Sequence, residues 1–187
     1  EGYTQVNDAQ ALWTIPAKDI SDEDYQQFYQ MLTHDFNDAL TYEHKHIQSV
    51  NTEFTSLLFV PKKAPMDLYF RDYSKKGLKL YVQRVFVMDE AEQFLPSYLR
   101  FVKGIIDCED LPLNVSREIL QTNPKTKAIK ASITKNVLKM LTKLAKKQPE
   151  DYQIFWSEFG AVMKEGAAQD FANKDLLMEL LRFTDQD

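Results

Sequence analysis

Two histidines, His44 and His46, come closest to a metal-binding pattern in type and spacing. They are separated by one residue, so on a strand both imidazole rings would face the same side, as metal ligands can. His34 is a candidate third ligand. However, no pair of cysteines accompanies the histidines, and His34 falls on a different predicted element. The sequence therefore favours ordinary surface histidines and predicts no metal site.

Cys108 lies beside three carboxylates, those of Asp107, Glu109 and Asp110. Their negative charge raises a thiol pKa and opposes a thiolate nucleophile, so we do not expect a catalytic cysteine. The carboxylates could act as general acid and base, but a run of charges in a loop is usually solvated, and we assign them no role. The sequence contains neither a Gly-x-Ser-x-Gly elbow nor a His-Glu-x-x-His motif, so no hydrolase site is visible.

Lysines dominate the stretch between Glu118 and Glu150, which contains no acidic residue. They are Lys125, Lys127, Lys130, Lys135, Lys139, Lys143, Lys146 and Lys147. Such a cationic helix face could bind an acidic protein or nucleic acid, although a solvated face is the default. No base-reading module accompanies the charge, so nucleic acid is not an expected partner.

Arg117 is the single cation whose position suggests phosphate chemistry. It follows Ser116, which is suited to cap a short helix that also holds Glu118 and Gln121. At a helix start, a guanidinium and free backbone N–H groups can meet a phosphate together. From the residues alone, the favoured interpretation is still an ordinary surface arginine paired with a nearby carboxylate.

Capping signals and periodicity predict the elements that position these residues in the first half of the chain. Ser21 and Asp24 form a capping box, and a helix with a buried aromatic stripe follows it. Residues 53–60 are rich in β-branched and aromatic residues and end at Pro61, which predicts a strand. Residues 78–87 alternate between two faces and are predicted as one further strand. The turn at 71–77 would make these two strands a hairpin or near neighbours.

Helices are predicted over the rest of the chain. Apolar residues at spacings of three and four predict a buried helix over 94–106. Asn123 and Pro124 begin a long amphipathic helix that ends near Lys147. The pattern stays helical after Pro149, with Gly166 as a stop. Because no strand signal follows residue 87, the sequence predicts a layered α/β unit with a helical extension.

Composition limits the possible functions. The 187 residues are 44% hydrophobic and 12% aromatic, enough for a core in one domain, or one domain with a helical appendage. The net charge of −5 gives no overall positive field to draw nucleic acid or anionic lipid. The five glycines are scattered singly, whereas a phosphate-cradling loop needs them clustered, so no nucleotide site is visible.

The same composition suggests a compartment. The single cysteine cannot form an internal disulfide, which fits a reducing environment. No apolar run approaches the roughly 20 residues that span a bilayer, so no membrane partner is expected. The chain does not begin with Met, which suggests that its ends were trimmed from a longer protein.

Two long segments carry a family resemblance. Residues 80–92 run LYVQRVFVMDEAE, and residues 111–121 run LPLNVSREILQ. They closely resemble the middle domain of the ninety-kilodalton heat-shock chaperones. Shorter segments at 12–14, 34–38 and 171–173 resemble the bacterial branch of that family, and the match covers nearly all of the chain.

The resemblance implies an α/β (α+β) fold: a layered αβα sandwich with a mixed sheet over residues 1–147, then a helical connector over 148–187. It also implies that the chain is part of a cytoplasmic, ATP-dependent chaperone for protein folding under stress. The N-terminal ATP-binding domain and the C-terminal dimerisation domain would lie outside the chain. ATP with Mg would be bound mainly by that N-terminal domain, so the fragment alone would hold no cofactor and would not be an enzyme.

The resemblance also implies roles for single residues. In the family, the loop and helix that match residues 114–121 reach the nucleotide when the chaperone closes. Arg117 would then contact the γ-phosphate during ATP hydrolysis, and Gln121 would support the same site. Asn114 would set the geometry of the loop, and Phe86 would help to hold it.

The partners implied by the resemblance are unfolded or partly folded client proteins, the chain's own N-terminal domain, a second copy in a full-length homodimer, and the seventy-kilodalton heat-shock chaperone. Lys135 is the expected docking residue for that acidic partner chaperone. Trp156 and Phe159 are expected client contacts, because aromatic anchors bury a large area at little entropy cost. Phe36 is a third expected client contact, although this sequence departs there from the eukaryotic relatives, which have a client-linked tryptophan. The alternative is a pure docking module without a catalytic contribution.

Overall fold

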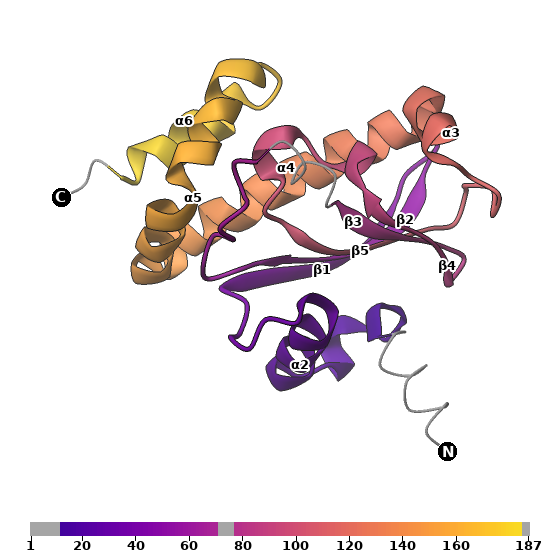
Figure 1. Ribbon diagram of the computed structural model, residues 1–187, viewed down its shortest axis with the longest axis horizontal. Helices are drawn as coiled ribbons and strands as arrows, with labels where there is room; N and C mark the ends of the chain where they lie inside the picture. Colours follow the sequence, from indigo (N-terminus) through magenta and orange to yellow (C-terminus); the bar gives the residue numbers. More distant parts are fainter. Residues whose placement is uncertain (1–11, 71–76, 185–187) are drawn as a thin grey trace.

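The computed structural model describes residues 12–70 and 77–184. They form three layers, in which helix α2 (Asp22–Thr33) lies under a five-stranded sheet and the long helix α4 (Pro124–Lys147) crosses the opposite face (Figure 1). Two further helices, α5 (Pro149–Gln169) and α6 (Lys174–Arg182), pack against α4. The predicted α/β class, a layered αβα sandwich with a mixed sheet, is confirmed. No helix in the described ranges has the length and apolar character that a membrane crossing needs.

The sheet has the strand order β1-β2-β5-β3-β4. Its strands are β1 (Thr41–Gln48), β2 (Glu53–Val60), β3 (Leu78–Val82), β4 (Val85–Ala91) and β5 (Lys103–Cys108). β3 and β5 run parallel, and the other neighbouring pairs are antiparallel. The predicted strand at 53–60 is confirmed, but it is not a neighbour of β3, because β5 lies between them. Most of the predicted turn at 71–77 lies outside the described residues.

Local capping signals set three helix starts as predicted. Ser21 Oγ accepts from the Asp24 backbone N–H at 3.1 Å, and the Ser21 N–H donates to the Asp24 carboxylate at 3.3 Å, which completes the capping box of α2. Ser116 caps the short helix α3 (Arg117–Thr122) by accepting a hydrogen bond from a backbone N–H of its first turn. Asn123 caps α4 just before Pro124.

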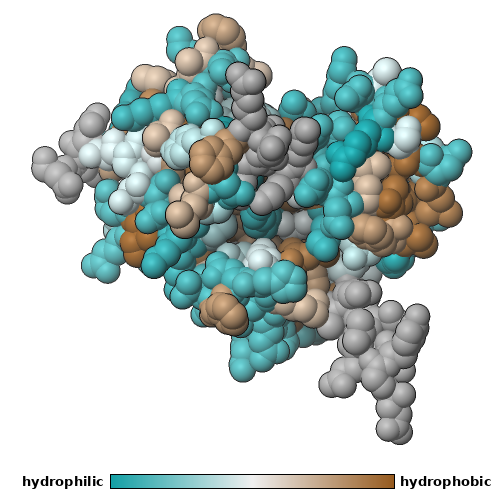
Figure 2. Space-filling model, viewed as in Figure 1, coloured by the Kyte–Doolittle hydropathy of each residue, from teal (hydrophilic) through white to brown (hydrophobic). Residues whose placement is uncertain are grey.

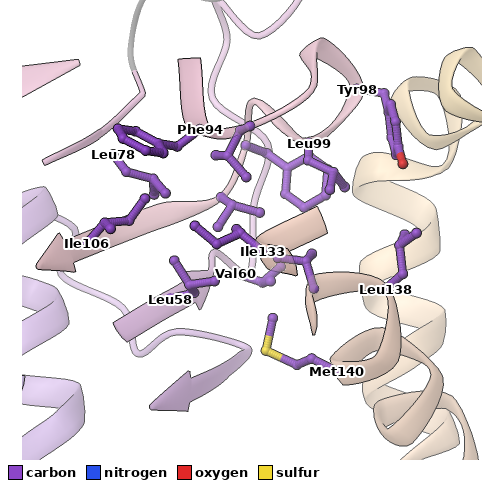
Figure 3. Packing of buried hydrophobic residues seen from close by; sticks show 14 of the residues in the cluster. Leu58, Val60, Leu78, Phe94, Tyr98, Leu99, Ile106, Ile133, Leu138 and Met140 are labelled. Carbon is purple, nitrogen blue, oxygen red and sulfur yellow. The ribbon is translucent and has the colours of Figure 1, made fainter. Parts of the chain in front are cut away.

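Successive side chains along a strand point to opposite faces of the sheet, and this divides the core into two parts. In β2, Leu57 and Phe59 face α2 and pack with Tyr29, whereas Leu58 and Val60 face α4. Figure 3 shows these two side chains pointing toward those of α4. The cluster on the α4 side continues without a break into α5 and α6, so both helices share its core. The division of the chain at residue 147 stays a prediction.

The predicted helix over 94–106 is wrong, and so is the prediction that no strand follows residue 87. The segment forms two 3₁₀ turns, Glu92–Phe94 and Ser97–Leu99, and then the central strand β5. β5 is buried on both faces, so its apolar residues do not alternate and its pattern resembles that of a buried helix. Gly104 has a φ of 145°, and a Cβ there would collide with the Leu57 carbonyl oxygen.

Two smaller predictions also need correction. Residues 78–87 form a hairpin instead of one strand, with Gln83 and Arg84 at positive φ (47° and 65°), as a type I′ turn requires. Neither turn residue is Gly, Asn or Asp, so the turn has no strong sequence signal. Gly166 does not end α5, which runs to Gln169. It packs instead against the ring of Tyr98, where a Cβ would collide.

Candidate functional site

Arg117 is the first residue of α3, and its side chain reaches back to β4. Its Nη1 donates to the Glu90 carbonyl oxygen at 2.8 Å, and its Nη2 donates to the Asp89 carbonyl oxygen at 3.0 Å. A guanidinium carries five N–H donors, so these two bonds orient the group and leave three donors for another acceptor. Arg117 is also exposed, so an acceptor from another molecule or domain can reach it.

A bulge in β4 presents the two carbonyl groups to Arg117. The register between β3 and β4 shifts between Leu78 and Leu80, so that Asp89 and Glu90 lie opposite one residue of β3. Glu90 has a φ of 56°, in the left-handed region that non-glycine residues seldom adopt. Bulges of this kind re-aim backbone groups, and here the re-aimed carbonyls hold a cationic side chain.

The charge of Arg117 is not neutralised by a carboxylate. Both of its hydrogen bonds go to main-chain carbonyls, and no ion pair joins it to an acidic residue in the described part of the chain. Arg84 and Arg100 differ, because they lie 3.1 Å from Glu109 and 3.0 Å from Glu165, respectively. Carbonyl dipoles orient a guanidinium without cancelling its charge. The surface arginine paired with a carboxylate, which spacing alone favours, is therefore not what the structure shows.

The loop before α3 is fixed at its base and exposed at its tip. Leu111, Val115 and the α3 residue Leu120 are buried. Leu113 and Asn114, between the first two of these anchors, are exposed. Each buried anchor contributes roughly 1.5–3 kcal/mol of transfer free energy. The core therefore holds the loop while leaving residues 113–114 open to an incoming surface.

Phe86 lies on β4, the strand that Arg117 contacts. It is 49% exposed, and its ring meets that of Tyr81 edge-on with 5.5 Å between centroids. Gln121 is exposed on α3, one helical turn after Arg117. Phe86 therefore lies on the strand to which Arg117 hydrogen-bonds, and Gln121 lies on the same helix as Arg117.

Exposed apolar side chains gather on the same elements. We call Val85 and Phe86 of β4, Leu113 of the loop and Ile119 of α3 the β4–α3 patch. Figure 2 shows brown atoms at the right edge of the molecule, where Figure 1 places β4, the loop and α3. Exposed apolar side chains on neighbouring elements can mark an interaction site.

The other predicted site residues lie on different elements from Arg117. Phe36 follows α2 and is 98% exposed, Trp156 of α5 is half-buried, and Lys135 of α4 is exposed. Phe159 is fully buried and stacks on Phe101 with 4.4 Å between ring centroids. The expected client contact at Phe159 is therefore wrong for this conformation, because the inward face of α5 carries its ring into the core.

The histidines make separate sets of hydrogen bonds. His44 Nε2 lies 2.9 Å from the Trp13 carbonyl oxygen, which can only accept, so Nε2 carries the proton and Nδ1 accepts from the Tyr25 hydroxyl at 2.8 Å. Burial lowers the pKa of His44. The His46 ring contacts Thr55 and Glu53 instead. No three potential metal ligands converge within residues 12–70 and 77–184.

Cys108 and its neighbouring carboxylates have structural environments. Burial, reinforced by the charge of Asp107, raises the pKa of the Cys108 thiol well above its usual range. Asp107 accepts from the indole N–H of Trp13 at 2.8 Å, and Asp110 accepts from a β2 backbone N–H at 2.8 Å. Glu109 pairs with an arginine, as described above. These contacts tie loops to the sheet, and the burial and raised pKa of the thiol disfavour a reactive thiolate.

Comparisons with known proteins agree with this fold. The family model described as "Hsp90 protein" matches residues 1–187. The chain belongs to the Hsp90 family. It is 59% identical over 181 residues to the chaperone protein HtpG of Vibrio vulnificus (strain YJ016), a match that covers 97% of this chain and 28% of that protein. It is 60% identical over 184 residues to HtpG of Shewanella frigidimarina (strain NCIMB 400), covering 98% and 29%, respectively.

A solved structure shows which part of an Hsp90 chaperone the chain resembles. The middle domain of a putative heat shock protein from Plasmodium falciparum matches with a TM-score of 0.78 and 26% identity, over 90% of this chain and 64% of that one. The chain spans less than a third of the length of the HtpG relatives above. The resemblance to an Hsp90 middle domain, inferred from residues 80–92 and 111–121, is thus confirmed.

Several surface features were missed from the sequence. The role of the Asp89 and Glu90 carbonyls depends on a bulge, which no residue type announces. Met66, Tyr69 and Phe70 are exposed on the segment after β2. Their signal was available, since they are apolar residues that follow Pro65 and fit no periodic element.

Proposed function

We propose that this chain is the middle segment of an ATP-dependent chaperone, and that Arg117 contacts the γ-phosphate of ATP held by the chaperone's N-terminal domain. The observation that carries the proposal is the oriented and uncompensated guanidinium of Arg117. Charge that develops on a transferred phosphoryl group must be met by a cation. An arginine supplied by another domain makes hydrolysis conditional on the closure of the two domains.

The residues of this chain fit a supporting role at the nucleotide. Its glycines are scattered, and no metal-ligand cluster occurs in the described ranges. As the family implies, ATP with Mg would be bound mainly by the N-terminal domain, and the ATP would supply the phosphoryl group that is transferred. Gln121, one turn after Arg117, can hydrogen-bond near the same phosphate. Asn114, at the exposed tip of the loop, and Phe86, on β4, would help to position the loop.

The β4–α3 patch is the surface that the N-terminal domain would cover on closure. Its members lie on β4, on the loop and on α3, and Arg117 belongs to α3 and hydrogen-bonds to β4. Burying them on docking would give the apolar contribution to closure, while Arg117 gives the contact to phosphate. The same elements would then serve both domain docking and catalysis.

The remaining partners follow from the family. Unfolded or partly folded clients would contact Phe36 and Trp156, and the full-length chaperone would act in the cytoplasm as a homodimer. Lys135 would dock the seventy-kilodalton heat-shock chaperone. The lysine-rich face also supports the second candidate function, that of a pure docking module, because Lys135 and Lys139 are exposed at a spacing of four residues on α4.

ATP turnover by the full-length protein separates the two functions. Arg117→Ala is compared with wild type and with Arg84→Gln, which removes a surface arginine from the adjacent hairpin, and nucleotide affinity is measured for all three. The catalytic proposal predicts loss of turnover with near-normal affinity for Arg117→Ala alone. Unchanged turnover would leave only the docking function. The isolated chain is expected to hydrolyse no ATP, and turnover that survived Arg117→Ala in the isolated chain would contradict the proposal.

A further inference from the structure

β1 forms one edge of the sheet, since within the described residues it pairs only with β2. The pairing is unbroken over all eight residues of the strand, from Thr41 opposite Val60 to Gln48 opposite Glu53. Alternate residues of an edge strand direct their backbone N–H and C=O groups away from the sheet. β1 therefore offers a regular row of hydrogen-bonding groups to one further strand.

The opposite edge of the sheet differs. β4 shifts register against β3 at two places, and Arg117 occupies two of its carbonyl groups. Bulges of this kind are a common way to prevent an edge from pairing with another chain. Within the described residues, β1 carries no bulge of this kind.

β1 lies along a groove of about 540 Å³. One wall is the C-terminal half of α4, which contributes Met140, Lys143, Leu144 and Lys147. The other wall comes from the 3₁₀ turn Ala17–Asp19 and from α2, and residues of β1 lie between the two walls. The groove is open to solvent and follows the edge of the strand.

The α4 wall is cationic. Lys45 of β1, Lys143 and Lys139 all act to lower the pKa of Glu43, against the rise caused by its burial, so they lie near this point of the edge. Lys147 lines the same wall. Several lysines thus surround one partly buried carboxylate, and the surplus positive charge favours an acidic occupant.

The opposite wall is largely apolar and aromatic. Tyr25 packs against Tyr42 with 4.5 Å between ring centroids, and Ala17 and Ile20 line the wall beside them. Successive side chains of an added strand point alternately to the two sides. An occupant that fits both walls would alternate acidic residues with apolar ones.

We propose that the edge of β1 binds an extended segment of a partner protein, in which acidic residues alternate with apolar residues, by adding it to the sheet as a sixth strand. Backbone hydrogen bonds to β1 supply affinity, and the lysine wall supplies specificity. A second copy of this chain does not fit, because pairing β1 with β1 would bring the two sets of lysines together. The site is distinct from Arg117 and the β4–α3 patch, so it does not depend on the proposed catalytic role.

The test uses the 187-residue chain and a synthetic ten-residue peptide that alternates Glu with Val and Thr. Binding is measured by fluorescence anisotropy, and hydrogen exchange is followed at the amides of β1. Two further peptides carry N-methyl groups on alternate residues, one on each edge. We expect protection of β1 amides, and we expect one N-methylated peptide to lose at least about tenfold in affinity while the other retains it.

Charge and register are tested in parallel. Lys143→Gln with Lys147→Gln is expected to weaken binding about tenfold, whereas Lys127→Gln, at the other end of α4, leaves it unchanged. A peptide of the same composition with its glutamates grouped at one end should bind poorly. The proposal is overturned if the grouped peptide binds equally well, if both N-methylated peptides bind alike, or if β1 amides stay unprotected. Each of these outcomes would show that the acidic peptides are attracted to the lysines non-specifically, without adding a strand to β1.

Discussion

Asp107→Asn is predicted to destabilise the protein strongly, although the two side chains have nearly the same size. Asp107 is 2% exposed in β5. Its Oδ2 accepts from the indole N–H of Trp13 at 2.8 Å, and its Oδ1 accepts from the Arg84 backbone N–H at 3.2 Å. An asparagine offers one acceptor oxygen, so its NH₂ group would face one of these two donors.

The expected cost combines two terms. A buried donor left without an acceptor costs about 1–3 kcal/mol, and a hydrogen bond to a charged group contributes about 1.5–3 kcal/mol. We therefore expect the free energy of unfolding to fall by roughly 3 kcal/mol. With a denaturant slope of about 2 kcal/mol/M, the urea midpoint would fall by about 1.5 M.

Urea unfolding followed by tryptophan fluorescence measures this change, and Asp110→Asn is the matched control. Asp110 accepts a single backbone N–H, that of Glu53, and is exposed, so an asparagine oxygen can replace its carboxylate. We expect the control to change stability by less than about 0.5 kcal/mol. The reasoning would be refuted if Asp107→Asn were no more destabilising than Asp110→Asn.

Three further predictions concern stability and reactivity. Gly104→Ala should prevent a stable fold, because its Cβ would collide with the Leu57 carbonyl oxygen; a normal thermal transition by circular dichroism would disprove this. Cys108 should resist iodoacetamide in the folded chain and react after unfolding, because it is buried and its thiol pKa is raised; fast alkylation of native protein would count against this. Burial lowers the pKa of His44, so the unfolded chain binds more protons and the free energy of unfolding should fall as the pH drops below about 6.5. Urea titrations at pH 7.5 and 5.5 should show a smaller drop in His44→Gln, and an equal drop would exclude this origin.

Sequence patterns predicted the elements whose causes are local. Ser21, Ser116 and Asn123 each mark a helix start through a hydrogen bond within a few residues, and all three bonds are present. β5 could not be recognised in this way. It is a central strand buried on both faces, and its approach to β2 depends on Gly104, whose role is visible only once the two strands are paired.

The candidate site shows the same limit. Spacing alone favoured an ordinary surface role for Arg117, and the family motif supplied the expectation of phosphate contact. The anchoring of Arg117 arises from the bulge at Asp89 and Glu90, which lie 28 and 27 residues away in sequence, respectively. Phe159 failed as a client contact because helical periodicity identifies an aromatic stripe without showing which of its members face the core.

The most direct test of the central claim is the affinity of the full-length protein for ADP with aluminium fluoride, a mimic of the transferred phosphoryl group, relative to its affinity for ADP alone. If Arg117 stabilises the charge of that group, Arg117→Ala should weaken binding of the mimic by about 10²- to 10³-fold and leave binding of ADP nearly unchanged. Arg84→Gln should change neither. Equal affinity of wild type and Arg117→Ala for the mimic would contradict the account and leave this chain a role in binding alone.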